Sequence, residues 1–316
     1  MKKTFFKTFF ISIIVFSVVW SGFIYKTVIK AEGEEEVYQE TFMDRLVDGK
    51  DDIIFLVLGV DSKDTSKNSK TRSDTMMLCR ADKSTGDISI LSIPRDTKTR
   101  IRGRQNEEKI NHAHAYGGPE LSVKAVKDLL GIDLEYYVRV DYNIVKEYVN
   151  LIDGVDIYVP MDMKYSDPVA DPPLYINLKK GQQVLYGDEA LQFLRFRKGY
   201  ANQDLGRIEA QQQFVKSAIE KTLRPENIVN IPQMIKSYYD YVDTNIPLDI
   251  IMKFGMKAKK FSTQGIQMAT LPGEGEYING VSYFIPDKEE SDRLVKTMFT
   301  EQRTVESFSD DGNEVN

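Results

Sequence analysis

Hydrophobic and polar positions change period repeatedly along this chain, which predicts strands and helices in a mixed order. Runs with strand character lie at residues 53–60, 75–80, 88–93, 136–140, 155–159, 267–271 and 283–285. Apolar residues at helical spacing lie at 121–130, 144–151, 188–194, 204–223, 230–242, 248–261 and 289–299. Residues 162–173 hold three prolines and several acids and are predicted to form a loop. The pattern predicts an α/β fold, a single domain with a mixed central sheet flanked by helices.

One N-terminal stretch is apolar all round. Residues 8–25 carry no charge, follow Lys2, Lys3 and Lys7, and at 18 residues approach the minimum for spanning a bilayer. A cleaved signal peptide is the alternative, but no A-x-A site follows the run. We therefore expect one transmembrane helix in a single-pass cell-membrane protein, with its N-terminus inside and the remainder extracellular. The expected segments are a cytoplasmic tail at 1–7, the anchor at 8–26, a stalk at 27–50, the globular domain at 51–300 and a disordered acidic tail at 301–316.

The composition excludes one class of partner and one kind of cross-link. The 316 residues include 42 Lys and Arg against 48 Asp and Glu, a net charge of −6. An acidic chain lacks the basic footprint of a nucleic-acid-binding protein, so no nucleic-acid partner is expected. Cys79 is the sole cysteine, which excludes an internal disulfide.

The segment 194–214 concentrates arginines beside apolar residues. Arg195 and Arg197 flank one aromatic residue, and in an extended segment both would point the same way. Helical spacing from Asp204 places Asp204, Arg207 and Gln211 on one face. One carboxylate cannot pair with three guanidinium groups, so a phosphate or diphosphate is the simplest missing partner. A solvated loop with scattered arginines is the alternative.

Charged residues also adjoin the first three predicted strands. Asp61 follows the first strand, Arg72 and Asp74 lead into the second, and Arg95 follows the third. Ligands of open α/β sheets bind at the carboxyl ends of strands. Asp61 and Asp74 are candidates for one magnesium site, because Mg²⁺ needs only one or two carboxylates when substrate phosphates complete its shell. Ordinary salt bridges are the alternative.

A polar stretch at 109–118 precedes the first predicted helix. Lys109 and Asn111 are interpreted as polar lining of the anion site. His112 and His114 suggest zinc, but no third ligand has convincing spacing. The chain holds no Walker A loop, no G-x-G-x-x-G and no G-x-S-x-G motif.

Together these segments resemble the LytR–CpsA–Psr family of membrane-anchored bacterial wall enzymes. The resemblance covers the anchor and most of 51–299 and depends, in order, on LVLGVDS, TRSDTMML, ISILSIPRDT, KINHAHAYGG and LRFRKGYANQDLGRIEAQQQF. It implies transfer of an anionic glycopolymer, such as wall teichoic acid, from an undecaprenyl-diphosphate carrier to peptidoglycan. The new bond is a phosphodiester to a muramic acid hydroxyl. Within the family, the chain looks most like the LytR or wall-teichoic-acid branch.

The resemblance also implies roles for individual residues. Asp61 and Asp74 correspond to aspartates associated with Mg²⁺, for which Mn²⁺ is a possible substitute. The residues that correspond to the diphosphate-binding arginines and their polar neighbour are Arg72, Arg95, Arg195, Arg197, Arg207 and Gln211. His114 stands where the resemblance leads us to expect an aromatic residue.

The predicted reaction needs charge neutralisation at the transferring phosphoryl group. Arg95 and Arg207 are assigned to that catalytic task, with Asp204 as candidate base; the alternative for Asp204 is an N-cap. The predicted partners are the polyprenyl-diphosphate-linked glycopolymer, the peptidoglycan acceptor and the membrane. Two rival functions use the same residues: a polyprenyl-diphosphate hydrolase, and a non-catalytic scaffold that binds lipid carriers.

Overall fold

The computed structural model describes residues 51–60, 71–169, 173–197, 199–200, 204–239 and 242–300. The predicted anchor, stalk and acidic tail lie outside these residues, as does Asp61. Within the described ranges, no helix has both the length and the apolar character that a bilayer crossing requires.

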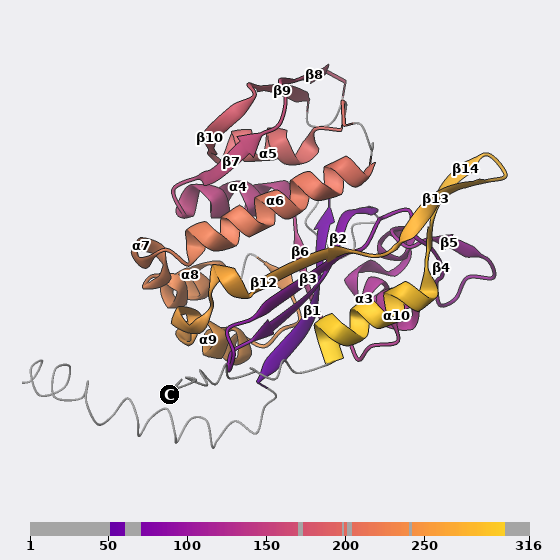
Figure 1. Ribbon diagram of the computed structural model, residues 1–316, viewed down its shortest axis with the longest axis horizontal. Coiled ribbons are helices and arrows are strands. Elements are labelled where there is room, and N and C mark those ends of the chain that lie inside the picture. The colour runs from indigo at the N-terminus through magenta and orange to yellow at the C-terminus, as the bar shows by residue number, and fades with distance from the viewer. Residues whose placement is uncertain are drawn as a thin grey trace, which may run out of the picture. The chain divides into compact units, whose positions relative to one another are not determined.

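A mixed sheet of six strands forms the centre of the domain (Figure 1). Its strands are β1 (Asp52–Val60), β2 (Ser73–Asp82), β3 (Ile88–Ser92), β6 (Tyr136–Val140), β11 (Asp243–Thr244) and β12 (Ile266–Thr270). They lie in the order β11-β6-β1-β2-β3-β12, with β6 parallel to β1, β12 parallel to β3, and β2 antiparallel to both β1 and β3. The start of β2 therefore lies at the same edge as the ends of β1, β3 and β6.

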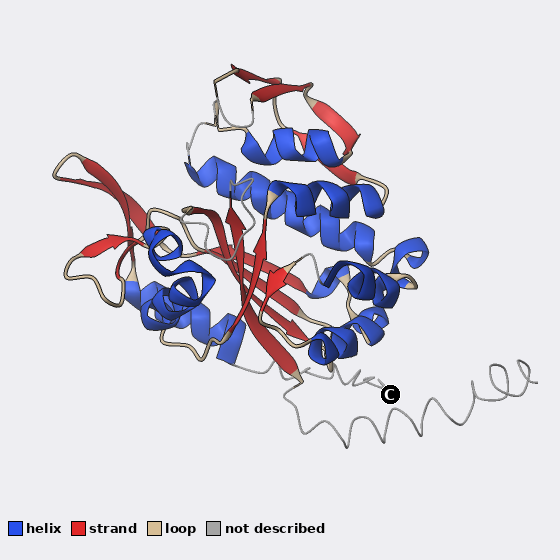
Figure 2. Ribbon diagram, turned by 180° about the vertical axis from the view of Figure 1, so that it is seen from behind, coloured by secondary structure: helices blue, strands red, loops and turns tan. Residues whose placement is uncertain are grey.

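Helices cover both faces of this sheet (Figures 1 and 2). The helices are α3 (His112–Leu130), α4 (Tyr142–Leu151), α5 (Gly187–Arg195), α6 (Asp204–Thr222), α7 (Pro225–Ile228), α8 (Ile231–Tyr238), α9 (Leu248–Met256) and α10 (Lys288–Val295). Helices α3 and α10 pack on one face through apolar residues that alternate along the strands, and α6 lies on the other. The predicted mixed α/β domain is confirmed in this respect.

Four shorter two-stranded sheets surround the central one. Their strands are β4 (Lys98–Arg100), β5 (Glu107–Lys109), β7 (Val155–Val159), β8 (Met163–Asp167), β9 (Leu174–Leu178), β10 (Gly181–Leu185), β13 (Gly273–Ile278) and β14 (Val281–Pro286). The hairpin of β13 and β14 projects from the domain in Figure 1. Strands β7 to β10 pack with α4, α5 and α6 around a second apolar core.

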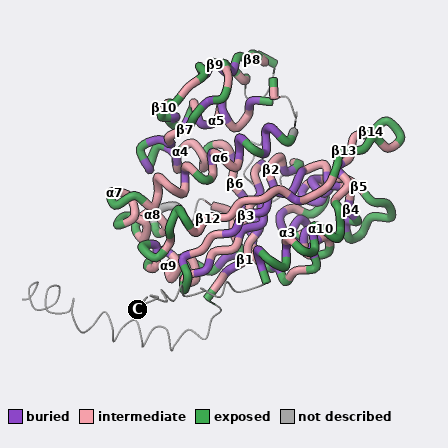
Figure 3. The backbone as a smooth tube through the Cα atoms, viewed as in Figure 1, coloured by how far each residue is buried: buried purple, intermediate pink, exposed green. Residues whose placement is uncertain are grey.

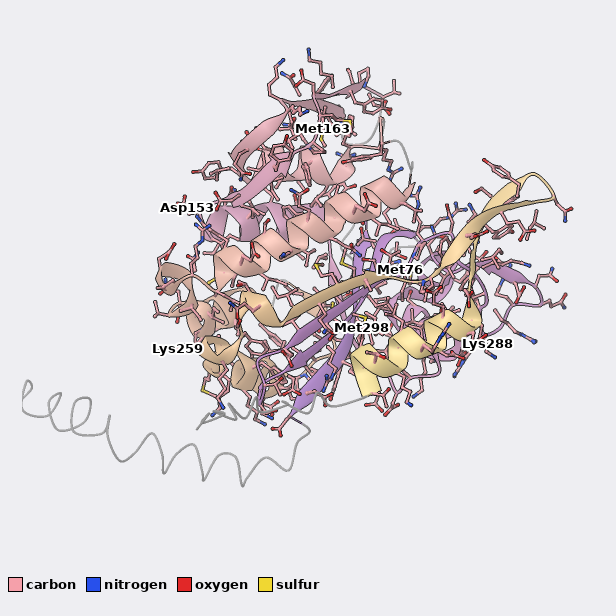
Figure 4. The ribbon with its side chains drawn as sticks, in the orientation of Figure 1. Met76, Asp153, Met163, Lys259, Lys288 and Met298 are labelled. Carbon is pink, nitrogen blue, oxygen red and sulfur yellow. The ribbon has the colours of Figure 1, made fainter. Side chains whose placement is uncertain are left out.

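Burial follows this division into two cores (Figure 3). Leu56, Leu78 and Leu91, from three adjacent strands, are each 0% exposed in the core beneath α3. Figure 4 shows Met76 and Met298 in that first core and Met163 in the second. The sheet therefore has one fully packed face, and α6 covers the opposite one.

One prediction of local structure was wrong, and one helical segment was missed. The segment 162–173 is not wholly a loop, because its first part forms β8, which pairs with β9. In β8, buried Met163 and half-buried Tyr165 alternate with exposed Lys164 and Ser166, a strand pattern that the prolines after it obscured. The helix predicted at 121–130 is present as the second part of α3: Gly117 and Gly118 have non-helical backbone angles and separate it from a first helical part that begins at His112, which was not predicted.

Two helix ends also differ from prediction. The helix predicted at 188–194 begins one residue earlier, at Gly187: its N-cap is Tyr186, and Asp188 lies in the first turn, paired with Lys146. Arg195 is the last residue of that same helix rather than part of an extended segment. Helices α8 and α9 are shorter than predicted. Several short strands were not predicted, because their apolar patterns are too short to recognise; they are β4, β5, β9, β10 and β13.

Candidate diphosphate site

Three separate segments of the chain meet at Asp74. Arg95, from the turn after β3, bonds through Nη1 to Asp74 Oδ1. Arg197, from the segment after α5, places its Nη2 atom 3.3 Å from Asp74 Oδ2. The Asp74 and Arg95 side chains are 24% and 23% exposed, whereas Arg197 is 50% exposed. Each oxygen of the carboxylate thus faces a different guanidinium group at the edge of the sheet, where an incoming anion can reach them.

Helix α6 brings two of the predicted side chains to the same edge. Gln211 donates from Nε2 to the hydroxyl of Thr75, 3.0 Å away and next to Asp74 in β2. Arg207 lies one helical turn earlier and is 3% exposed. Gly59 makes this packing possible, since a Cβ there would lie 2.9 Å from the Thr75 Cβ atom. A glycine at the end of β1 therefore allows Thr75 to hold α6 in place.

Arg195 has a different partner from Arg197. Its guanidinium carbon lies 4.6 Å from the ring centroid of Tyr142, the first residue of α4. Because α4 follows β6 almost directly, this stacking places Arg195 near the end of the strand next to β1. The two arginines part because the helix ends between them.

The predicted polar lining adjoins Arg95. The backbone N–H of Asn111 donates to the Arg95 carbonyl at 3.2 Å, and the Asn111 side chain is 5% exposed. Lys109 is paired with Asp96, Nζ to Oδ1 at 3.0 Å. In the described part of the chain, the buried Oδ1 of Asn111 and hydroxyl of Ser73 have no hydrogen-bond partner. A polar ligand would relieve that cost, which is about 1–3 kcal/mol for each such group.

Three predicted residues are not placed beside Asp74. Arg72 is exposed and lies close enough to Tyr116 to lower its pKa electrostatically, a minor effect beside the Glu108 hydrogen bond that raises it. Asp61 lies outside the described residues. Asp204 begins α6, but its side chain is also outside what the structure describes.

The sequence analysis did not predict a role for Gln212, which bonds α6 to strands β3 and β12. Its Nε2 atom lies 3.0 Å from Ser92 Oγ, 3.0 Å from the Ala269 carbonyl and 3.1 Å from Thr270 Oγ1. The next residue, Gln213, bonds instead to a β7 carbonyl. Successive residues of a helix point about 100° apart. Three consecutive glutamines can therefore bond to three different neighbouring elements, and the sequence QQQ could have predicted such contacts.

The donor set is compatible with Mg²⁺ bound together with phosphate, but it is not a complete metal cage. Among the residues that the structure describes, no three His, Cys, Asp or Glu side chains form a metal-binding group. Asp74 offers one carboxylate, and phosphate oxygens would have to complete the shell. The two histidines serve other partners: His112 bonds to Glu108 and His114 to the Thr71 carbonyl.

An apolar layer lies beside the polar edge, on the face that α6 covers. Met77, Cys79 and Ile90 are buried there. The partly buried residues that pack against them are Phe55, Val57, Ile88, Val215, Ile219 and Met268. Burial raises the pKa of the Cys79 thiol to about 12, consistent with these surroundings. Along β2 the same face therefore changes from Thr75, which binds Gln211, to purely apolar side chains.

A pocket of about 460 Å³ lies elsewhere, at the base of the β13–β14 hairpin. Its lining includes Glu274, Glu276, Asp287 and Glu290. Four carboxylates repel a diphosphate, so this pocket is the wrong site for the predicted chemistry.

Comparison with known proteins identifies the family of this chain. The model of the LytR_cpsA_psr family matches residues 19–300. The chain is 31% identical over 247 residues to the polyisoprenyl-teichoic acid–peptidoglycan teichoic acid transferase TagV of Bacillus subtilis strain 168, a match that covers 77% of this chain and 63% of that relative. The chain thus spans slightly less than two thirds of that protein.

Two solved structures have a similar fold. The crystal structure of B. subtilis TagV superposes with a TM-score of 0.67 and 28% identity, covering 81% of this chain and 100% of that one. A structure of TagT bound to LIIa-WTA superposes with a TM-score of 0.62 and 28% identity, covering 79% and 90% of the two chains.

Proposed function

This chain belongs to the LytR–CpsA–Psr family, and from that premise we propose that it transfers a glycopolymer such as teichoic acid from a polyprenyl diphosphate to peptidoglycan. The named relatives support this reaction class. The single structural observation that carries the proposal is the Asp74 carboxylate held between Arg95 and Arg197. Two neighbouring guanidinium groups, of which Arg95 is 23% and Arg197 is 50% exposed, match the oxygens of a diphosphate.

The arginines act on charge in the proposed reaction. The acceptor sugar hydroxyl attacks the sugar-side phosphorus, forming the phosphodiester while the bond from that phosphorus to the bridging oxygen breaks. The lipid leaves as its monophosphate, and the hydroxyl proton passes to a base, for which Asp204 is the candidate. Arg95 and Arg207 would stabilise the charge that develops on the phosphoryl oxygens; one such contact is worth about 2.7–4 kcal/mol, or roughly two to three decades in rate.

Mg²⁺, or Mn²⁺ in its place, is part of this proposal. Asp74 and Asp61 would hold the ion, and it would supply further positive charge to the diphosphate. Asp74 already forms ion pairs with two guanidinium groups. The protein's own part is therefore to keep Asp74 oriented by Arg95 and Arg197 whether or not the ion is bound.

The lipid and the membrane complete the proposal. We assign the polyprenyl chain to the apolar layer around Met77 and Cys79, which adjoins the polar edge at Thr75. The uncharged run at 8–25 supports a single-pass anchor with the N-terminus inside and the catalytic domain extracellular. That arrangement would place the domain where both lipid carrier and peptidoglycan are within reach.

The test is transfer of a lipid-linked teichoic acid to peptidoglycan by the purified full-length protein. We expect acceptor-dependent product, lowered by about two to three decades in Arg95→Ala. Arg102→Ala is the matched control, because Arg102 also pairs with a carboxylate, Asp128, but on an exposed surface. Near-normal transfer by folded Arg95→Ala would refute the assigned role.

The same assay separates the two rival functions. A hydrolase would release lipid phosphate and free polymer phosphate without any peptidoglycan. A scaffold would bind the lipid carrier and yield no product of either kind. Lipid binding with no product, in the presence of Mg²⁺ and acceptor, would overturn the proposed transferase activity.

A further inference from the structure

A buried histidine is bonded to the segment that carries two of the site residues. His114, on α3, is 1% exposed, and its Nδ1 atom lies 2.7 Å from the Thr71 carbonyl oxygen. Thr71 directly precedes Arg72, and Asp74 follows two residues later in β2. The contact thus joins α3 to the backbone at which the site segment enters the sheet.

The protonation state of the ring suits this contact. Burial is the main cause that lowers the pKa of His114 below its usual 6.5, and the charge of Arg139 lowers it further, so the ring is neutral at pH 7. A carbonyl oxygen only accepts, and therefore Nδ1 carries the proton. The other nitrogen, Nε2, is buried and has no hydrogen-bond partner among the described residues. Among the described residues, the neutral ring thus forms one hydrogen bond, which Nδ1 donates to the Thr71 carbonyl.

The ring lies near a buried ion pair on the sheet. Arg139, 3% exposed, bonds through Nε to Asp243 Oδ2 at 2.9 Å, and the two residues are opposite each other on β6 and β11. Tyr137 adds a hydroxyl bond to the same carboxylate at 3.3 Å. Both Arg139 and Asp243 act electrostatically on His114. Packed surroundings of this kind leave the ring little freedom to move away from Thr71.

We propose that His114 is a positioning residue for the diphosphate site: by holding the Thr71 carbonyl, it fixes the backbone that leads into β2 and orients Asp74 at the edge of the sheet. This inference deepens the proposed function and rests on it. His114 itself touches no reacting atom. Its loss would weaken substrate binding that depends on Asp74 and Mg²⁺, while leaving the fold in place.

The experiment measures binding of geranylgeranyl diphosphate in the presence of Mg²⁺ by calorimetry, and KM and kcat for transfer, in the full-length protein. His114→Phe keeps a ring but no donor, and we expect binding about tenfold weaker and KM raised by a similar factor, with kcat less affected. His114→Asn retains an N–H near the position of Nδ1, and we expect it to restore binding to within about threefold of wild type. Hydrogen exchange should be faster at residues 71–74 in the Phe variant.

The matched control is Ser122→Ala. Ser122 is fully buried on the same helix and bonds to a backbone carbonyl, that of Gly118, 3.0 Å away. Equal effects on binding and exchange in Ser122→Ala and His114→Phe would overturn the proposal, as would normal binding by folded His114→Phe. If His114→Phe does not fold, His114→Gln is the second variant, since its longer side chain moves the donor away from Thr71; normal binding there also overturns the proposal. If wild type binds no diphosphate, the proposed function fails instead, and increased exchange at residues 71–74 in His114→Phe still reports the backbone contact.

Discussion

Replacing Asp74 with Asn separates two roles that the structure gives to one carboxylate. In the wild type, Asp74 neutralises Arg95 and Arg197. It is also the proposed Mg²⁺ ligand that lies within the described residues. Asn keeps the shape and one acceptor oxygen, but it turns an NH₂ group toward a guanidinium that can only donate. The variant therefore leaves two cations close together with no anion between them.

The size of the effect follows from distance and exposure. Two unit charges about 4 Å apart interact by about 4 kcal/mol at an effective dielectric constant of about 20. Asp74 and Arg95 are about a quarter exposed, so we reduce this figure to about 1–2 kcal/mol of stability. For a domain of this size the melting temperature should fall by about 2–8 °C.

Ligand binding should change in the opposite direction when no metal is present. With the competing carboxylate removed, geranylgeranyl diphosphate in EDTA should bind Asp74→Asn up to about tenfold more tightly. Transfer should nevertheless fall by about two to three decades, and its dependence on Mg²⁺ should weaken. Differential scanning fluorimetry, calorimetry and the transfer assay measure these three quantities on the same sample.

The control is Asp128→Asn, which breaks the exposed pair with Arg102. Its melting temperature should change little, and its binding and transfer should match wild type. Weaker metal-free binding by Asp74→Asn would contradict the reasoning, because it would mean that the carboxylate organises the arginines rather than competing with the ligand. Unaltered transfer and Mg²⁺ dependence would show that Asp74 has no part in the reaction.

Three further predictions address other parts of the domain. Gln212→Ala should lower the free energy of unfolding by about 1–3 kcal/mol in urea denaturation, whereas Gln213→Ala, at a more exposed bond, should change it little; equal losses would contradict the role given to Gln212. Hydrogen bonds, chiefly from Tyr116, lower the pKa of Glu108 from 4.5 to about 2, so this group stabilises the fold above pH 4.5 and loses that effect as the pH falls toward 2. The difference in melting temperature between wild type and Glu108→Gln should accordingly be constant above pH 5 and vanish near pH 2; a difference that persists at pH 2 would count against the hydrogen-bond assignment. Val57→Phe adds bulk to the apolar layer, so it should weaken binding of a long polyprenyl diphosphate but not of inorganic diphosphate, and equal effects on both would exclude this layer as the lipid contact.

The short-range pattern of the sequence was sufficient to predict the central elements. The period of the apolar residues predicted β1, β6, β7 and the helix that begins at Asp204, because packing a face against a core is a property of neighbouring residues. Strands with few apolar residues, such as β8, could not be predicted in this way. The resemblance of five motifs was enough to predict the family, which the family comparison confirmed.

Which charged groups meet was decided only by the tertiary structure. Nothing in the order of residues specified that Asp74 lies between Arg95 and Arg197, that Arg195 stacks on Tyr142, or that His114 bonds to Thr71. Those contacts depend on strand order, on the antiparallel register of β1, β2 and β3, and on where α5 ends. Register and strand order arise from packing between distant segments. Local periodicity therefore predicts where helices and strands form, but not which of their side chains come into contact.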